Sequence, residues 1–92
     1  MERPGGADYA VNPMVTVRLF ASLRELAGAS RVDVEATDVA GVLRALSERL
    51  GPRFDGIMAA GTVVVNGDRA EPDTPVGPAD EVALLPPVSG GA

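Results

Sequence analysis

The 92-residue sequence predicts one α+β domain in which a small mixed sheet packs on one main helix. Two segments, 14–20 and 31–35, alternate apolar and polar residues with the period of a β-strand. A third segment, 39–50, carries apolar residues at helical spacing on one face. Several strands around a single amphipathic helix are typical of this fold class. Because that helix has only one apolar face, a single sheet is enough to cover it.

The first part of the expected domain holds two strands joined by a short helix. The first strand is expected over 14–20. Residues 21–27 are rich in helix formers, and Gly28 can end that helix in a left-handed conformation. The second strand follows over 31–35. A short helical connection between the two strands fits an antiparallel pair.

The main helix is expected over 39–50, with Thr37 or Asp38 as its N-cap. Gly51-Pro52 should stop this helix, because glycine accepts a left-handed cap and proline cannot continue the hydrogen-bond ladder. The apolar stripe of the helix consists of Val39, Val42, Leu43, Leu46 and Leu50. We expect this stripe to face the valines of the strands and to form the core.

A hairpin is expected in the second half of the domain. Residues 53–61 should form a loop or one helical turn, with Phe54 and Ile57 tucked beneath it. The β-branched run over 62–66 then predicts a well-buried strand. Asn66-Gly67 is the strongest turn signal in the chain and predicts a tight hairpin.

The chain closes with a brief return strand at Arg69-Ala70, a proline-rich loop over 71–80 and a last strand over 81–85. We divide the chain into a disordered leader, an ordered domain and a flexible C-terminal tail, over 1–13, 14–85 and 86–92. The leader contains two glycines and two prolines and has no periodicity that would bury a face. Met14, at the start of the ordered part, is a second candidate for the translation start.

Cysteine, histidine and lysine are absent from the sequence, and their absence excludes most catalytic chemistry. Without cysteine there is no disulfide, thiolate metal site or iron–sulfur cluster. Without histidine and lysine the chain lacks the usual base near neutral pH and cannot form a Schiff base. A net charge of −5 argues against nucleic acid as a partner. We find no apolar run of membrane-spanning length and no signal peptide, and therefore expect a cytoplasmic protein.

The remaining candidate for chemistry is the tail, residues 86–92. Asp33, Glu35, Asp38, Asp73, Asp80 and Glu81 are interpreted as solvated or capping carboxylates, and the serines have no base to activate them. In the tail, Pro86-Pro87 stiffen the exit from the last strand, and Gly90-Gly91 carry no side chains. Such a thin peptide can thread a narrow channel and deliver a carboxylate into a partner's active site. A frayed chain end is the alternative.

From Met14 to Gly91 the chain resembles the small subunit of molybdopterin synthase, in the ubiquitin-like β-grasp family of sulfur carriers. The resemblance rests on the segments VRLFASLRELAG, RLG at the end of the main helix, VVVNG at the hairpin, and DEVALLPPVSGG. The last segment is the most specific of the four. The resemblance implies a single β-grasp domain that is not an enzyme by itself, with catalysis in the large subunit of the synthase.

The resemblance also implies a function for Gly91, preceded by Gly90. A ubiquitin-activating-like adenylyltransferase with sulfurtransferase activity would use ATP to adenylate the Gly91 carboxylate. A persulfide sulfur would then displace AMP and leave a thiocarboxylate, which the large synthase subunit or another acceptor enzyme would consume. The chain itself would bind no cofactor and no metal, and it would contact neither nucleic acid nor membrane.

The partner-binding residues that the resemblance implies are Phe20, Leu85, Pro86, Pro87 and Val88. Phe20 and Leu85 are expected to form an exposed apolar patch; a second small core over the short helix is the alternative for Phe20. Arg69 occupies a position where the family often has an apolar residue, so the chain departs from the family pattern there.

Family members usually end at the second glycine, whereas this sequence continues to Ala92. With Ala92 attached, the Gly91 carboxylate is part of a peptide bond and cannot be adenylated. A peptidase removes Ala92, or the gene does not encode it, or the carrier is inactive as written. Alternative functions are a carrier for cysteine, thiamine or a thio-containing natural product, a ubiquitin-like protein modifier joined to target lysines, and a noncatalytic binding module.

Overall fold

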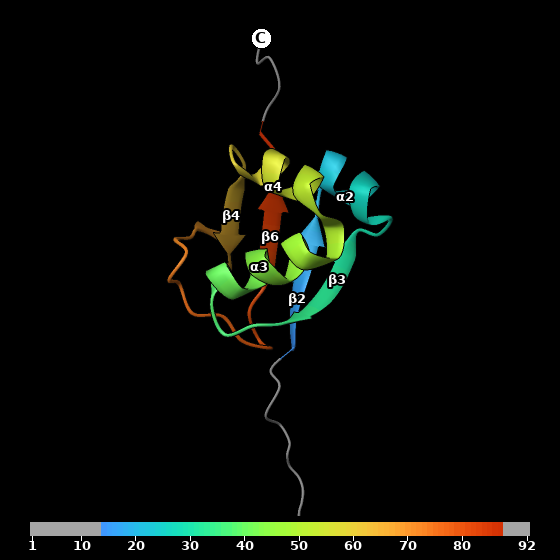
Figure 1. Cartoon of the computed structure of the whole chain (residues 1–92). Helices are drawn as coiled ribbons and strands as arrows, with labels where there is room; N and C mark the ends of the chain where they lie inside the picture. The colour runs from blue at the N-terminus through green and yellow to red at the C-terminus, as the bar shows by residue number, and fades with distance from the viewer. Residues whose placement is uncertain (1–13, 88–92) are drawn as a thin grey trace, which may run out of the picture.

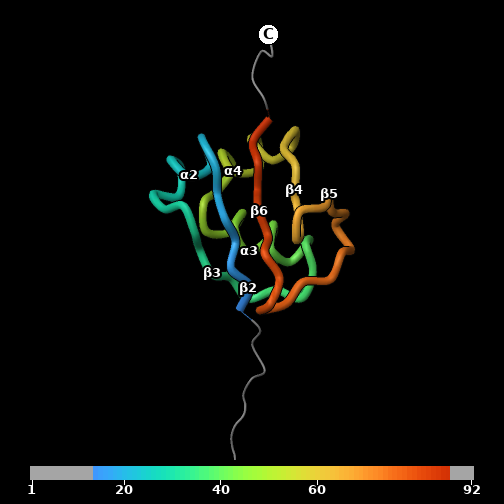
Figure 2. Tube along the Cα trace, turned by 180° about the vertical axis from the view of Figure 1, so that it is seen from behind, coloured from blue at the N-terminus to red at the C-terminus, as the bar shows by residue number. Residues whose placement is uncertain are grey.

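The computed structural model describes residues 14–87, which form five strands and three helices. In chain order these are β2 (Met14–Leu19), α2 (Ala21–Ala27), β3 (Arg31–Glu35), α3 (Val39–Leu50), α4 (Pro52–Met58), β4 (Thr62–Val65), β5 (Asp68–Arg69) and β6 (Val82–Leu85). The helices lie together on one side of the sheet (Figure 1). Seen from behind, β2 and β6 lie in front of α3 (Figure 2). We call the side of the sheet away from the helices the open face.

The strands form one mixed sheet in the order β3-β2-β6-β4-β5. β2 pairs antiparallel with β3 and parallel with β6, and β4 pairs antiparallel with both β6 and β5. The predicted mixed sheet on one main helix is confirmed, as is the antiparallel pairing of the first two strands. Because β6 is the central strand, the chain that follows it leaves from the middle of one end of the domain (Figure 2).

The core lies between the sheet and the helices and consists almost entirely of aliphatic side chains. Its most deeply buried members are Val15, Val17, Leu19, Leu23, Val34, Val39, Val42, Leu46, Phe54, Val82 and Leu84. Alternation along the strands placed most of these residues correctly. In the predicted stripe of α3, Leu43 and Leu50 are only partly buried and pack at the margin of the core.

The segment after α3 is more regular than the sequence suggested. Residues 52–58 form the helix α4, where we expected a loop or one turn. Gly51 ends α3 as predicted, with a φ of 84°. Pro52 then begins a new helix, because the first helical position needs no N–H partner and suits the fixed φ of proline. Burial of Phe54 against the core, which was predicted, stabilises this short helix.

The hairpin forms where Asn66-Gly67 predicted it. Both residues have positive φ values, 53° and 88°, as the two-residue hairpin turn requires. The return strand β5 begins one residue earlier than expected, at Asp68. The Asn66 side chain then donates a hydrogen bond to Asp80 and accepts one from the backbone N–H of Glu81, both at 2.9 Å. These bonds tie the start of the last strand to the hairpin.

Candidate docking face and tail exit

The tail begins at the centre of the sheet. Leu85, the final residue of β6, is in register with Thr62 of β4. Pro86 is half-buried and Pro87 is exposed, and neither belongs to a strand or helix. Proline has a fixed φ and favours an extended residue before it, so the chain continues outward from β6. β6 points toward the end of the domain where α2 and α4 lie (Figure 1).

Gly61 packs closely against this exit. A Cβ atom at Gly61 would lie 2.8 Å from the carbonyl oxygen of Leu85 and 2.9 Å from Sδ of Met58. The methionine side chain could move aside, but the backbone oxygen could not do so without shifting β6. Glycine is therefore required at the point where the tail begins. No local pattern predicted this contact, since Gly61 lies in the segment that we expected to be a loop or one turn.

Phe20 lies beside Leu85 at the same end of the sheet. Leu19 and Leu84 are in register across the parallel strands β2 and β6, and both side chains are buried on the helix side of the sheet. Successive residues of an extended chain point to opposite faces, so Phe20 and Leu85 both lie on the open face. Phe20 is the N-cap residue of α2, one residue beyond β2 and not within the strand as predicted. Ala21 follows with a φ of 51°, a left-handed conformation that is uncommon for a residue with a Cβ atom.

Three apolar side chains of the open face belong neither to the core nor to the fully exposed surface. Phe20, Leu85 and Val64 are half-buried. None of the three belongs to the core of residues 14–87 or to the partly buried side chains that pack on it. We expected Phe20 and Leu85 to be exposed outright, whereas among the described large apolar residues only Met14 is, at 46%. The packing gives no support to the alternative role of Phe20 in a second small core.

An arginine accounts for part of the burial of Phe20. The Cζ atom of Arg18 lies 5.4 Å from the centroid of the Phe20 ring, within the range of a cation–π contact. The same guanidinium donates a hydrogen bond from Nη1 to Oε2 of Glu81 at 2.9 Å. Arg18 therefore holds a positive charge directly beside the apolar end of the open face.

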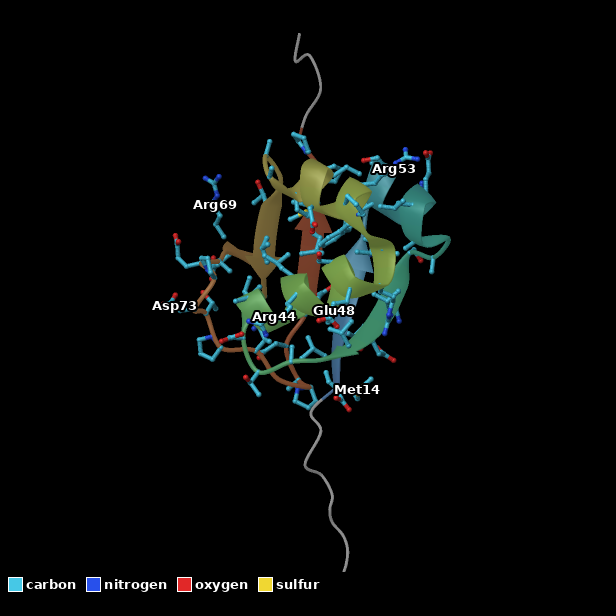
Figure 3. All side chains as sticks on the ribbon, viewed as in Figure 1. Met14, Arg44, Glu48, Arg53, Arg69 and Asp73 are labelled. Atoms are coloured by element: carbon cyan, nitrogen blue, oxygen red, sulfur yellow. The ribbon has the colours of Figure 1, made fainter. Side chains whose placement is uncertain are left out.

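Arg18 belongs to a row of residues that crosses all five strands. The strand registers pair Arg31 with Arg18, Arg18 with Ala83, Ala83 with Val64, and Val64 with Arg69. Residues that are directly opposite on paired strands share a face, so all five belong to the open face. Arg69 projects outward at the sheet edge (Figure 3). Of these five residues only Arg69 was named in the sequence analysis. The other four were missed because the register between strands cannot be determined from the sequence alone.

The rest of the predicted site lies outside the described residues. Val88, Gly90, Gly91 and Ala92 all follow Pro87, where the description of the structure ends. The structure therefore brings Phe20, Leu85 and Pro86 to one end of the domain. It places Arg69 on the edge strand of the same face.

The other chemical groups of residues 14–87 do not form a second site. Asp38 accepts a hydrogen bond from the backbone N–H of Gly41 and Asp80 one from Gly77, each at 2.8 Å. Asp38, and not Thr37, is therefore the N-cap of α3, and Asp80 caps a turn, so both carboxylates have the capping role expected of them. No cluster of acidic, histidine or cysteine residues in this range could hold a metal ion. None of the helices described is both long and apolar enough to span a membrane.

A mixed sheet on one main helix, with a chain end that leaves the central strand, defines a ubiquitin-like β-grasp protein. The small archaeal modifier protein 1 of Methanosarcina acetivorans has this fold and is 28% identical, with a TM-score of 0.76 over 87% of this chain and 98% of that chain. The Haloferax volcanii protein of the same name is 31% identical, with a TM-score of 0.73 over 85% and 99%.

A third similar structure comes from the complex of subunits 1 and 2 of the molybdopterin-converting factor of Helicobacter pylori. Its matching chain is 25% identical, with a TM-score of 0.61 over 85% of this chain and 99% of that one. Residues 17–91 match the model of the ThiS family. The chain belongs to the ThiS family, the ubiquitin-like sulfur carriers, whose small members are non-catalytic partners. The resemblance drawn from the sequence is thereby confirmed.

Proposed function

We propose that this carrier bears a thiocarboxylate on Gly91 and donates its sulfur in molybdopterin biosynthesis, as the small subunit of molybdopterin synthase in the cytoplasm. One observation carries the proposal. The half-buried pair Phe20 and Leu85 lies on the open face at the end from which β6 continues into the tail. A partner that covers this pair is therefore positioned to receive the tail. Similarity to a chain of the H. pylori subunit complex supports this choice of pathway.

The chemistry on the tail requires no side chain of the carrier. An ATP-dependent, ubiquitin-activating-like partner adenylates the Gly91 carboxylate and releases pyrophosphate, which turns a poor electrophile into a reactive one. Sulfide displaces AMP and leaves the thiocarboxylate directly. When the donor is a persulfide, a thiol must also reduce the sulfur–sulfur bond. The absence of cysteine, histidine and lysine is compatible with this division of labour.

The carrier's own residues dock and aim the tail. Phe20 and Leu85 supply apolar contact area, and the Pro86-Pro87 pair followed by Val88 continues it toward the chain end. Gly61 leaves the space that the carbonyl oxygen of Leu85 occupies at the end of β6. Gly90 has no side chain, so the end of the tail fits a channel too narrow for larger residues.

The test compares a chain that ends at Gly91 with one that ends at Ala92. Each is incubated with the activating adenylyltransferase of the same genome, ATP and sulfide, and its intact mass is measured. We expect the chain ending at Gly91 to gain the mass difference between sulfur and oxygen, and the chain ending at Ala92 to gain nothing. A peptidase that uses a zinc-bound water to cleave the Gly91–Ala92 bond would convert one into the other. Equal charging of both chains, with Ala92 still attached, would contradict this mechanism.

A control variant isolates the terminal residue. Gly91→Ala in the chain that ends at position 91 should be charged poorly, because glycine alone lets the backbone approach the nucleotide closely. Transfer of sulfur from the charged carrier to a molybdopterin precursor, with the large subunit added, identifies the pathway. If the charged carrier supports cysteine or thiamine synthesis and not this transfer, the molybdopterin assignment is wrong.

A ubiquitin-like protein modifier is the second candidate. It is favoured by the similarity to the two archaeal modifier proteins, at 28% and 31% identity. In that case the activated Gly91 would form an amide with a lysine of a target. The same mass measurement separates the two functions. Ligation adds the mass of a whole target protein, whereas formation of the thiocarboxylate adds only the mass difference between sulfur and oxygen.

A further inference from the structure

The row Arg31, Arg18, Ala83, Val64 and Arg69 carries three arginines and no acidic residue, although Asp33 and Glu35 of β3 lie on the same face. The chain has a net charge of −5, yet three of its eight basic residues lie in this single cross-strand row. The two residues at its centre, Ala83 and Val64, are small or apolar. The row is therefore an apolar centre with guanidinium groups on both sides.

The fold does little to compensate these charges. Arg31 and Arg18 are directly opposite on paired strands, where like charges are destabilising. Among residues 14–87 the structure shows an ion pair for Arg18, with Glu81, and none for Arg31 or Arg69. The neighbouring carboxylate of Asp33 accepts a hydrogen bond from the hydroxyl of Thr16 at 2.9 Å. Internal ion pairing therefore does not explain the arginines at the two ends of the row.

An apolar centre flanked by arginines is the composition of a protein-docking surface. Interfaces are enriched in arginine and place their charged groups at the rim. Phe20 and Leu85 extend the apolar centre toward the tail exit, so the row and the tail belong to one continuous surface. Three arginines could also meet phosphates, but the half-buried apolar side chains between them and the acidic chain favour a protein.

We propose that the activating adenylyltransferase, which receives the tail to adenylate Gly91, presents an apolar patch flanked by carboxylates, which pair with Arg31 and Arg69. This inference rests on the proposed function. Arg69 then determines specificity: a partner with an apolar residue opposite it would leave a guanidinium desolvated and without a counter-charge, which is costly. Arg31 has the same role at the other end of the row.

The experiment measures ATP–pyrophosphate exchange by the activating adenylyltransferase of the same genome, with increasing concentrations of the carrier ending at Gly91. The variants are Arg69→Glu and Arg31→Glu, and the matched control is Arg44→Glu. Arg44 is exposed on α3, on the side of the helices (Figure 3). All three variants change the net charge equally, so only the position of the charge differs.

We expect Arg69→Glu and Arg31→Glu each to raise KM about tenfold at low ionic strength and to leave kcat within about twofold. The difference should shrink in high salt, because ions screen exposed charges. Arg44→Glu should stay within about twofold of the unchanged carrier, since α3 lies on the other side of the sheet. Arg69→Lys should retain most of the activity, because the charge is kept.

Two further outcomes decide the inference. If Arg69→Leu binds as well as the unchanged carrier, the contact at Arg69 is apolar and the inference is wrong, while normal charging leaves the proposed function intact. The inference is also wrong, with the proposed function intact, if Arg69→Glu and Arg44→Glu change KM equally. It is likewise wrong if single-stranded RNA binds to the row and inhibits the exchange reaction. If the unchanged carrier is not charged at all, the proposed function fails, and the inference fails with it.

Discussion

The two faces of the sheet differ in what their apolar residues do. Along β4, Val63 and Val65 pack in the core, while Val64 between them is half-buried on the open face. Along β6, Leu84 is fully buried and Leu85 is not. The fold therefore needs only one face of each strand. Apolar residues on the other face are available for a partner. Substitutions on the helix-covered face should therefore lower the free energy of unfolding, whereas apolar substitutions on the open face should mainly weaken binding.

The largest expected effect is on the helix-covered face. Leu46 is completely buried in α3, so Leu46→Ala removes apolar contacts and leaves a cavity. It should lower the free energy of unfolding by about 2–5 kcal/mol. The matched change on the open face, Val64→Ala, should cost less than about 1 kcal/mol, because Val64 is outside the core. Denaturant titration of both variants measures the contrast, and a loss below about 0.5 kcal/mol for Leu46→Ala would remove this helix stripe from the core.

The next largest effect is expected at Gly61, which lies against the carbonyl oxygen of Leu85 at the end of β6. Gly61→Ala places a methyl group against the carbonyl oxygen of Leu85 and should cost about 1–3 kcal/mol, as other overpacked sites do. Gly56→Ala is the control, since a Cβ there meets nothing within 4 Å and Gly56 lies inside α4. Alanine is the better helix former, so this control should be neutral or stabilising by up to about 1 kcal/mol. Thermal unfolding that places both variants on the same side of the unchanged protein would contradict the close packing at Gly61.

A smaller effect, on binding and not on folding, is expected at Phe20. Phe20→Ala should weaken the affinity for the large synthase subunit by more than about 1 kcal/mol, because aromatic side chains at docking surfaces carry much of the binding energy. Met14→Ala, at the other end of β2, is the control and should bind normally. Titration calorimetry measures affinity, and denaturant titration measures folding. An unfolded Phe20→Ala variant that regains full affinity when stabilised would place Phe20 in the core.

Most of the fold could be predicted from local patterns in the sequence. Alternation fixed the first two strands, helical spacing fixed α3, and Asn66-Gly67 fixed the hairpin, because each pattern depends on residues close together in the chain. The helix α4 was missed because its stability comes from the burial of Phe54 and not from local periodicity.

The candidate site depends on contacts between distant segments, and less of it could be predicted. Phe20 and Leu85 were found through the family resemblance alone. Ala83 and Val64 became visible as part of the row only once β2, β6 and β4 were seen in register. The close contact of Gly61 with Leu85 likewise joins residues that are far apart in the sequence. Register and close approach are therefore the information that a single sequence lacks.

The smallest effect is expected for Glu81→Gln, which tests whether the open face contributes to stability at all. Glu81 pairs with Arg18 at 2.9 Å, but their side chains are 61% and 46% exposed. Water and salt weaken such a pair, so its loss should lower the free energy of unfolding by less than about 1 kcal/mol, and by less still in high salt. Glu48, which is exposed on α3 away from the open face, provides the matched control as Glu48→Gln, and this change should leave the free energy of unfolding nearly unchanged. Denaturant titration at low and high ionic strength measures both variants. A salt-dependent loss above about 2 kcal/mol for Glu81→Gln alone would mean that the charges of the open face hold the fold together, and that the row of arginines is not free to serve a partner.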